Sequence, residues 1–476
     1  MKSDLPPAAA EFTEMRALFE RQRAAVANDP YPARAVRADR LERLESLLRG
    51  HAEELSAAIS RDFGSRSVHE TQLLELFPSL EVLKHARRHL RRWMRPERRE
   101  TSLWFQPASS QVISQPLGVV GIVVPWNYPV YLAAGPLAGA LAAGNRALVK
   151  MSETTPATGE LLARLVSDRF DPEELSVVNG GPALAQAFCR LPFDHLLFTG
   201  STSVGRHVMR AAADNLTPVT LELGGKSPAI IGRRFPVAEA AGRILFGKCL
   251  NAGQTCIAPD YVLVPEESLD AFVDAARAAV ASMYPRLADN PDYSAIVDDR
   301  HRRRLDACLD EAVAGGATAI ALNPAGEDLG ASGKRAPTLL KGVRDDMAVM
   351  REEIFGPLLP LVPYRELDEA IAFVNARPRP LALYVFDHDP ASVDRVIHRT
   401  VSGGVTVNET ILHIAQDDLP FGGVGPSGMG HYHGREGFHT FSKRKAVFRQ
   451  SRLNGLKLFR PPYGKRFAML ARLLLR

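Results

Sequence analysis

The sequence predicts an α/β protein with a doubly wound parallel sheet, and three observations support this fold class. First, residues 119–124 form a branched apolar run, "VVGIVV", which is typical of a strand buried on both faces. Second, the similar runs "NRALVKMSE", "LSVVNGG" and "HLLFTGS" alternate with helical segments such as "PLAGALAAG" and "ALAQAFCRL". Third, each strand ends in Gly, Asn or Ser. Ligands of such sheets bind at the carboxyl ends of the strands, so these polar residues are candidate site residues.

The segments on either side of this sheet have different patterns. Residues 11–92 are helical in pattern, with a stop at Gly64 and leucines three and four residues apart, namely Leu41, Leu44, Leu47, Leu48 and Leu55. A second α/β stretch runs from "PAIIGRRF" to about residue 424 and contains the helical segment "SLDAFVDAARAAVASMY". The polar, alternating stretch "LWFQPASSQVI" predicts an exposed hairpin, which invites pairing with a neighbouring subunit.

Length and composition narrow the class of protein. A chain of 476 residues predicts two or three domains. The 46% of hydrophobic and 24% of charged residues are typical of a globular protein. Four scattered cysteines without a CxxC pair form neither a disulfide scaffold nor a zinc knuckle, so we expect no metal site and a reducing cytoplasm.

Charge and hydropathy bear on the possible partners. The basic run "HARRHLRRWMRPERRE" has arginines in pairs at helical spacing and Trp93 as its one aromatic residue, which favours a solvated or subunit-facing helix over a nucleic-acid partner. No apolar run approaches the roughly 18 residues of a membrane-spanning helix, and the N-terminus lacks a secretory signal. The basic, apolar C-terminal segment "RFAMLARLLLR" could lie on a lipid surface, but we favour packing against the protein body.

One cysteine has unusual neighbours. In "NAGQTCIAPDY", Cys256 follows Gly253, Gln254 and Thr255, which suits a turn that presents the sulfur to a cleft. Cys256 is therefore a candidate nucleophile, although this stretch alone also fits a cysteine that is simply buried.

Two motifs place further chemical groups near strand ends. In "LELGGKSP", Glu222 lies in an apolar stretch, which raises a carboxyl pKa and suits a general base; a salt-bridged structural carboxylate is the alternative. In "PWNYP", the Asn127 amide could stabilise an oxyanion or cap the turn.

Two other strand ends suit a nucleotide. "FTGSTSVG" has glycines around Ser201 and Thr202 where a helix begins, and such a site favours a pyrophosphate, although a plain turn fits equally well. "LVKMSE" brings together Lys150 and Glu153, which could bind ribose hydroxyls or form a surface ion pair.

The order of these motifs is more specific than any one of them. "PWNYP", "FTGSTSVG", "LELGGKSP", "GQTC" and "EEIFGP" follow one another, with 34 positions between Glu222 and Cys256. The set resembles the aldehyde dehydrogenase superfamily, from about residue 20 to the end. The resemblance implies that Cys256 is the attacking thiolate, that Glu222 activates water, and that Asn127 and the Cys256 amide bind the oxyanion.

The resemblance also implies a cofactor site for NAD. Met151 stands where the family usually has proline, so NADP remains open. The implied cofactor-binding residues are Trp126, Lys150, Glu153, Gly200, Ser201, Thr202, Gly205, Leu223, Glu353 and Phe355. Tyr128 would line the aldehyde site, as could Trp126, and His413 could meet a phenol hydroxyl unless it is only a solvated loop residue.

Finer similarity lies in other segments. "SGMGHYHGREGFHTFSKRKAV" and the tail look like the class 3 branch, which implies a homodimer, and "AISRDFGSRSVHET" looks like bacterial coniferyl aldehyde dehydrogenases. The expected reaction is NAD(P)-dependent oxidation of an aldehyde to its acid through a cysteine thiohemiacetal and thioester. Aromatic, coniferyl-type aldehydes are the first expectation and medium-chain aliphatic aldehydes the alternative. A coenzyme-A-acylating enzyme is disfavoured because it would not need Glu222.

The expected organisation has three parts. Residues 1–100 and 115–223 form the NAD(P)-binding domain, and residues 224–424 form the catalytic domain. Residues 101–114 and 425–476 form a small β oligomerisation arm and the C-terminal tail.

Overall fold

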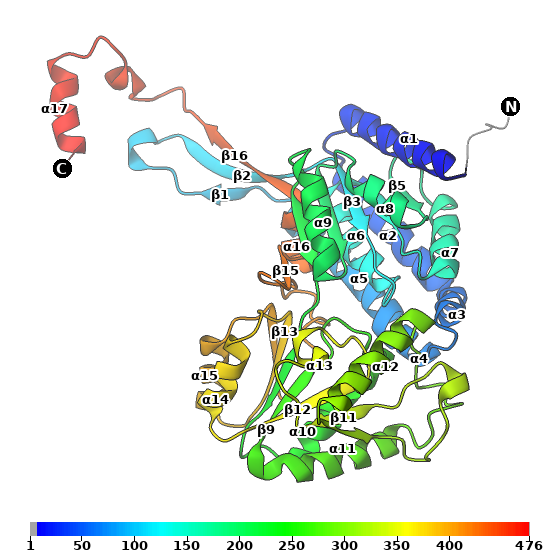
Figure 1. The fold of residues 1–476 in the computed structure, drawn as a ribbon. Helices are drawn as coiled ribbons and strands as arrows, with labels where there is room; N and C mark the ends of the chain where they lie inside the picture. Colours follow the sequence, from blue (N-terminus) through cyan, green and yellow to red (C-terminus); the bar gives the residue numbers. More distant parts are fainter. Residues whose placement is uncertain (1–6, 476) are drawn as a thin grey trace.

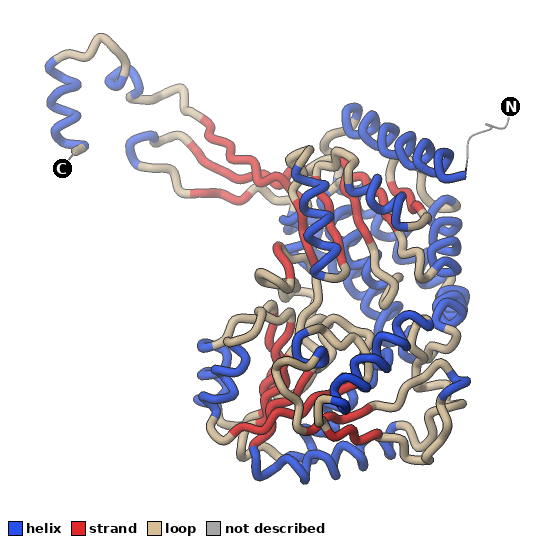
Figure 2. Tube along the Cα trace, in the orientation of Figure 1, coloured by secondary structure: helices blue, strands red, loops and turns tan. Residues whose placement is uncertain are grey.

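The protein has a body of two α/β units and an arm that projects from it (Figure 1). This structure is a computed structural model of the chain and describes residues 7–475. Its strands fall into three separate sheets, one in each unit and one in the arm (Figure 2).

The first sheet confirms the predicted doubly wound fold. Its strand order is β15-β7-β6-β3-β4-β5, and all neighbours are parallel except β15. Because the order reverses between β3 and β6, ligands are expected beyond the carboxyl ends of these two strands. The strands are β3 (Val119–Val123), β4 (Arg146–Lys150), β5 (Leu175–Val178), β6 (His195–Thr199), β7 (Val219–Glu222) and β15 (Gly428–Met429).

Helices cover both faces of this sheet because its strands are apolar on both sides. Val119 and Val123 of β3 pack with apolar side chains of α1, α8 and α9, whereas Val120 and Ile122 pack with those of α2, α5, α6 and α7. The helices are α1 (Pro7–Asn28), α2 (Arg34–Gly50), α3 (Ala52–Phe63), α5 (Phe77–Trp93), α6 (Tyr131–Ala143), α7 (Pro156–Ser167), α8 (Pro182–Cys189) and α9 (Thr202–Ala213). The predicted stop at Gly64 is confirmed, since this glycine ends α3 with φ +73°.

The second unit has a sheet of order β10-β11-β12-β9-β8-β13-β14, in which only β10 is antiparallel to its neighbour. Its strands are β8 (Pro228–Ile231), β9 (Tyr261–Pro265), β10 (Thr318–Ala321), β11 (Thr338–Lys341), β12 (Leu358–Tyr364), β13 (Ala382–Phe386) and β14 (Gly404–Val407). Its helices include α10 (Val237–Cys249), α11 (Leu269–Met283), α12 (Asp299–Ala314), α13 (Ala348–Arg351), α14 (Leu367–Asn375) and α15 (Pro390–Arg399).

The arm is an antiparallel sheet of β1 (Glu97–Arg99), β2 (Ser109–Pro116) and β16 (Ser442–Arg449). The predicted exposed hairpin is present, and its tip, η2 (Leu103–Phe105), exposes three large apolar side chains. Residues 425–441 lie outside the arm, because β15 pairs with β7 and α16 (Gly434–Thr440) packs on α6.

The C-terminal tail does not pack on the body as we favoured from the sequence. After β16 the chain forms η6 (Leu456–Phe459) and α17 (Lys465–Leu474), and α17 lies apart from both units (Figure 1). The tail packs on itself, because the Phe467 ring lies 4.6 Å from that of Tyr463. Among the described residues, no helix is both long and apolar enough to span a membrane.

Candidate active site

Cys256 follows a turn of unusual backbone conformation. The turn connects α10 to β9, and Asn251, Ala252 and Gly253 have φ values of +49°, +51° and +76°. A side chain at Gly253 would collide with the Gly356 carbonyl, so glycine is required where the turn meets the segment "EEIFGP". The turn leaves Cys256 partly exposed, whereas the other three cysteines are buried.

Hydrogen bonds from two amide side chains hold this turn. The Gln254 Nε2 donates to the Ala295 carbonyl at 3.0 Å, and its Oε1 accepts from the Val297 amide at 2.9 Å. The Asn251 Nδ2 donates to the Asn127 carbonyl at 3.1 Å. The turn is therefore fixed to the second unit and to the loop that follows β3.

The candidate oxyanion donor lies beside the same turn. Asn127 is 3% exposed, and its Nδ2 donates to the Gln254 carbonyl at 3.2 Å. The next residue, Tyr128, forms a 2.6 Å hydrogen bond between its hydroxyl and the Thr255 hydroxyl. Folding thus brings Asn127 and Tyr128 to the two residues that precede Cys256.

A buried ion pair supports this loop from behind. The Arg66 Nη1 lies 2.8 Å from Glu75 Oε1 and also donates to the Asn127 carbonyl at 2.9 Å. The second Glu75 oxygen accepts from the Val130 amide at 2.7 Å. Both charged side chains are fully buried, so they connect the N-terminal helices to the position of Asn127.

A second buried carboxyl supports the cysteine turn. Glu70 accepts from the Asn251 amide at 3.1 Å and from the Ser294 hydroxyl at 2.6 Å. Arg66, Glu70 and Glu75 were not predicted from the sequence as site residues. The one available signal was Glu75 itself, a charge within the apolar run "LLELF".

Glu222 ends β7 inside the body, with Gly428 of β15 opposite it. The side chain is 2% exposed, and among the described residues neither carboxylate oxygen has a hydrogen-bond partner. Burial raises the pKa of Glu222 well above its ordinary value, as its apolar surroundings predicted.

The sulfur and two carboxyl groups share one electrostatic environment. Burial raises the pKa of the Cys256 thiol, and the nearby Glu353 and Glu222 raise it further. The backbone N–H groups of Cys256 and Ile257 donate toward the sulfur and oppose this shift. These two backbone amides favour the thiolate form of Cys256.

Glu353 lies in the loop between α13 and β12, beside the chain that follows Glu222. Burial raises its pKa to about 8, and Oε1 is shielded from solvent without a partner among the described residues. A side chain at Gly224 would collide with this carboxylate. Glycine therefore lets the loop approach closely.

Aromatic rings connect this loop to the end of β3. The Trp126 ring lies 5.3 Å from Phe355 and 4.8 Å from His301. Phe355 has φ +47°, a left-handed conformation that is uncommon for a bulky residue and is often found at functional sites.

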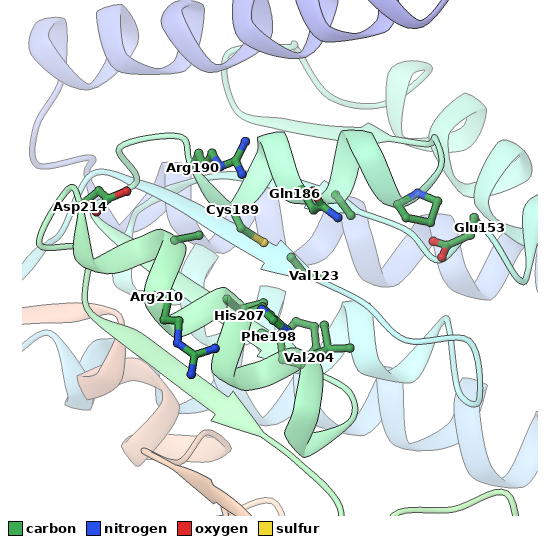
Figure 3. Close-up of a pocket in the computed structure, with 14 residues that line it drawn as sticks. Val123, Glu153, Gln186, Cys189, Arg190, Phe198, Val204, His207, Arg210 and Asp214 are labelled. Atoms are coloured by element: carbon green, nitrogen blue, oxygen red, sulfur yellow. The ribbon is translucent and has the colours of Figure 1, made fainter.

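A cavity of about 810 Å³ lies between α8 and α9 at the carboxyl ends of β3 and β6 (Figure 3). Its volume is within the range of ligand pockets, roughly 300–1,000 Å³. Glu153 lies at one end and Asp214 at the other. Lys150, at the end of β4, lies 3.9 Å from Glu153 and donates to the Met151 carbonyl.

The N-terminus of α9 leads from this cavity toward Glu222. Ser201 caps the helix, and the Thr202 hydroxyl donates to the Pro426 carbonyl at 3.0 Å. A side chain at Gly205 would lie 2.7 Å from a methyl group of Leu223. A side chain at Gly200 would collide with the ring of Phe198 in β6. These contacts and the cavity fit a dinucleotide that extends from α8 toward Glu353.

His413 is not a solvated loop residue. No hydrogen bond among the described residues joins it to the cysteine turn. Its Nδ1 lies 2.8 Å from the Thr406 hydroxyl, its ring stacks on Phe421, and burial lowers its pKa to about 4. The alternative of a solvated loop residue is therefore wrong.

Comparison with known proteins identifies the family. The model of the Aldehyde dehydrogenase family matches residues 13–447. The chain belongs to the aldehyde dehydrogenase family. It is an NAD(P)-dependent enzyme that oxidises aldehydes. Among the described residues, no group of three or more His, Cys, Asp or Glu is arranged to hold a metal ion.

Relatives with related names cover almost the whole chain. A probable coniferyl aldehyde dehydrogenase of Pseudomonas aeruginosa is 57% identical over 96% of this chain and 95% of its own length. A coniferyl aldehyde dehydrogenase of a Pseudomonas species is 52% identical over 90% of both chains.

Solved structures of the family have the same fold. The substrate-bound AldH of Staphylococcus aureus has a TM-score of 0.91 at 38% identity and covers 97% of this chain and 99% of its own. A betaine aldehyde dehydrogenase of the same organism, in complex with NAD+, has a TM-score of 0.84 at 26% identity, with 94% of this chain and 91% of its own covered.

Proposed function

We propose that this aldehyde dehydrogenase oxidises aromatic, coniferyl-type aldehydes to carboxylic acids through a thioester on Cys256. The observation that carries the chemistry is the convergence of Asn127, Glu222 and the Cys256 turn. The substrate class is supported by two relatives, named for coniferyl aldehyde, that are more than half identical to this chain.

In the first step, the Cys256 thiolate forms a bond to the carbonyl carbon, and an electron pair of the C=O bond moves to oxygen. The Asn127 amide and the Cys256 backbone amide donate to this oxyanion. One such donor is worth about 3 kcal/mol in a site that excludes water. Collapse of the oxyanion releases a hydride and leaves a thioester, and NAD+, when bound, supplies the acceptor for that hydride.

In the second step, Glu222 takes a proton from water, whose oxygen attacks the thioester carbon. The C–S bond breaks, the acid leaves, and the thiolate is restored. A raised pKa makes the Glu222 carboxylate a stronger proton acceptor, and neither of its oxygens is engaged by another described residue.

A pair of substitutions tests these roles. Cys256→Ala should abolish turnover while NAD binding, measured by calorimetry, persists. Glu222→Gln should give one burst of reduced cofactor per active site and then stall, because the thioester forms but is not hydrolysed. Wild-type turnover by Cys256→Ala, or a burst that falls together with the steady rate in Glu222→Gln, would contradict the roles.

The substrate class requires a separate measurement. We expect kcat/KM for coniferyl aldehyde to exceed that for a straight-chain aldehyde with a similar number of carbon atoms, and the rate should not depend on added coenzyme A. A preference for the aliphatic aldehyde would reject the aromatic assignment and leave the aldehyde dehydrogenase activity intact.

We also propose that the enzyme is a homodimer formed through the arm. Leu103, Trp104 and Phe105 at the hairpin tip and Phe448 of β16 are exposed apolar side chains, and such clusters are typical of protein interfaces. All four cysteines are free, which favours a reducing compartment. We therefore propose that the enzyme acts in the cytoplasm.

A further inference from the structure

The C-terminal tail, residues 449–476, differs in charge from the rest of the chain. It contains eight basic residues and no acidic residue; the last acidic residue of the sequence is Glu436. Since the whole chain has a net charge of +5, the preceding 448 residues carry −3. The positive charge of this protein is therefore concentrated in its last 28 residues.

This charge is not neutralised within the subunit. Seven of the basic residues lie in the described part of the chain, and none of them forms an ion pair there. By contrast, Arg444, five residues before the tail, pairs with Glu97. The seven residues are Arg449, Arg452, Lys457, Arg460, Lys465, Arg466 and Arg472.

Helix α17 has an apolar face with basic residues on the side opposite it. Phe467, Leu470, Ala471 and Leu474 recur at the i, i+3, i+4, i+7 spacing of one helical face. Lys465 and Arg472, seven residues apart, share the opposite side. Exposed apolar side chains also occur at Tyr463, Met469 and Leu475.

We propose that this tail binds the surface of a membrane that contains anionic lipid. An amphipathic helix with Lys and Arg on one face and Phe and Leu on the other lies in the interface of such a membrane. Basic segments are attracted there by the negative surface potential. A protein surface would need carboxylates at matching places along the whole tail, whereas the negative charge of an anionic lipid surface is continuous and needs no such match.

The test measures binding of the full-length enzyme to vesicles. We expect sedimentation with vesicles of phosphatidylcholine that contain phosphatidylglycerol, release by high salt, and no binding to phosphatidylcholine alone, because salt screens the attraction. The variant Lys465→Gln/Arg466→Gln/Arg472→Gln should bind at least tenfold more weakly, with unchanged kcat/KM measured without vesicles.

A matched control removes three charges elsewhere. Arg88, Arg91 and Arg92 are exposed on α5 and belong to the other dense basic run. Arg88→Gln/Arg91→Gln/Arg92→Gln should bind vesicles like the wild type. Equal loss of binding in both triple variants would mean general charge attraction and would overturn the proposal.

A further variant tests the apolar face. Phe467→Ser/Leu470→Ser keeps every charge and should also weaken vesicle binding at least tenfold; unchanged binding would overturn the assignment of α17 as the inserted helix.

Three other results would overturn the proposal. These are no binding of the wild type to anionic vesicles, equal binding to duplex DNA at the same salt, or a changed sedimentation coefficient of the tail variant with vesicle binding intact. The last result would identify the tail as a contact between subunits.

Discussion

The cysteine turn and the groove between α8 and α9, which fits a cofactor, are built differently. Around the turn, buried side chains such as Gln254, Asn251 and Glu75 are engaged in hydrogen bonds that join distant segments. Around the groove, Glu153 is about half exposed and the lining between α8 and α9 has few interactions of this kind. Bond making requires a fixed sulfur and amide, whereas a cofactor must bind and leave at every turnover.

The largest expected effect comes from removing the support of the turn. Arg66→Met leaves Glu75 buried without its partner, which typically costs about 3–5 kcal/mol of stability, and it removes one of the two side-chain hydrogen bonds to the Asn127 carbonyl. We expect a lower melting temperature and a fall in kcat of at least tenfold, with the NAD dissociation constant within about twofold of the wild type.

The matched control for Arg66 is Arg40, whose buried guanidinium pairs with Glu174 far from the cysteine turn. Arg40→Met should lower the melting temperature but leave kcat near the wild-type value. If kcat falls equally in both variants, the loss reflects general destabilisation and the comparison between turn and groove fails.

A smaller effect concerns Glu353, whose carboxylate acts on the Cys256 thiol. Its pKa of about 8 is above the unfolded value of 4.5, so the folded protein binds the proton more tightly. The contribution of this proton to the free energy of unfolding is fully present below pH 4.5 and is lost as the pH rises through 8. Glu353→Gln should therefore gain stability relative to the wild type, by about 2.5 kcal/mol between pH 5 and pH 7.

Melting temperatures of the cofactor-free enzyme across this pH range measure the gain. Glu352→Gln, which changes the exposed neighbouring carboxylate, should keep the wild-type dependence on pH. A Glu353→Gln curve parallel to the wild type would show that this carboxyl is not buried in solution.

The smallest effect is expected in the groove. The new methyl group of Gly205→Ala would displace Leu223, so we expect cofactor binding about tenfold weaker, or about 1.4 kcal/mol, with kcat at saturating NAD little changed. Gly242→Ala in α10 meets no neighbouring atom and should bind NAD normally. If the Gly205→Ala variant binds NAD with normal affinity, Leu223 does not contact the cofactor.

Much of the fold could be predicted from the sequence because its signals are local. The apolar run of β3 and the Gly64 stop indicate their structures within a few residues. The motifs around Asn127, Glu222 and Cys256 are also local, and the resemblance to a known family brought them together before any geometry was available.

The supporting residues could not be predicted in the same way. Arg66 and Glu70 act on segments far along the chain, and the short loop and helix in which they lie give no sign of those partners. The position of α17 was also missed, because amphipathic spacing shows that a helix has an apolar face and does not show what covers it.

The path of the chain between the two units has a mechanical consequence. It crosses once after β7 and returns before β15, and the two crossings are bonded to each other, since the Leu223 amide donates to the Ser427 carbonyl at 3.1 Å. Two crossings that are bonded to each other restrict twisting of one unit against the other more than a single strand of chain would. Glu222 lies directly beside them, so a displacement of one unit against the other would move the carboxyl that we propose to activate water relative to the sulfur.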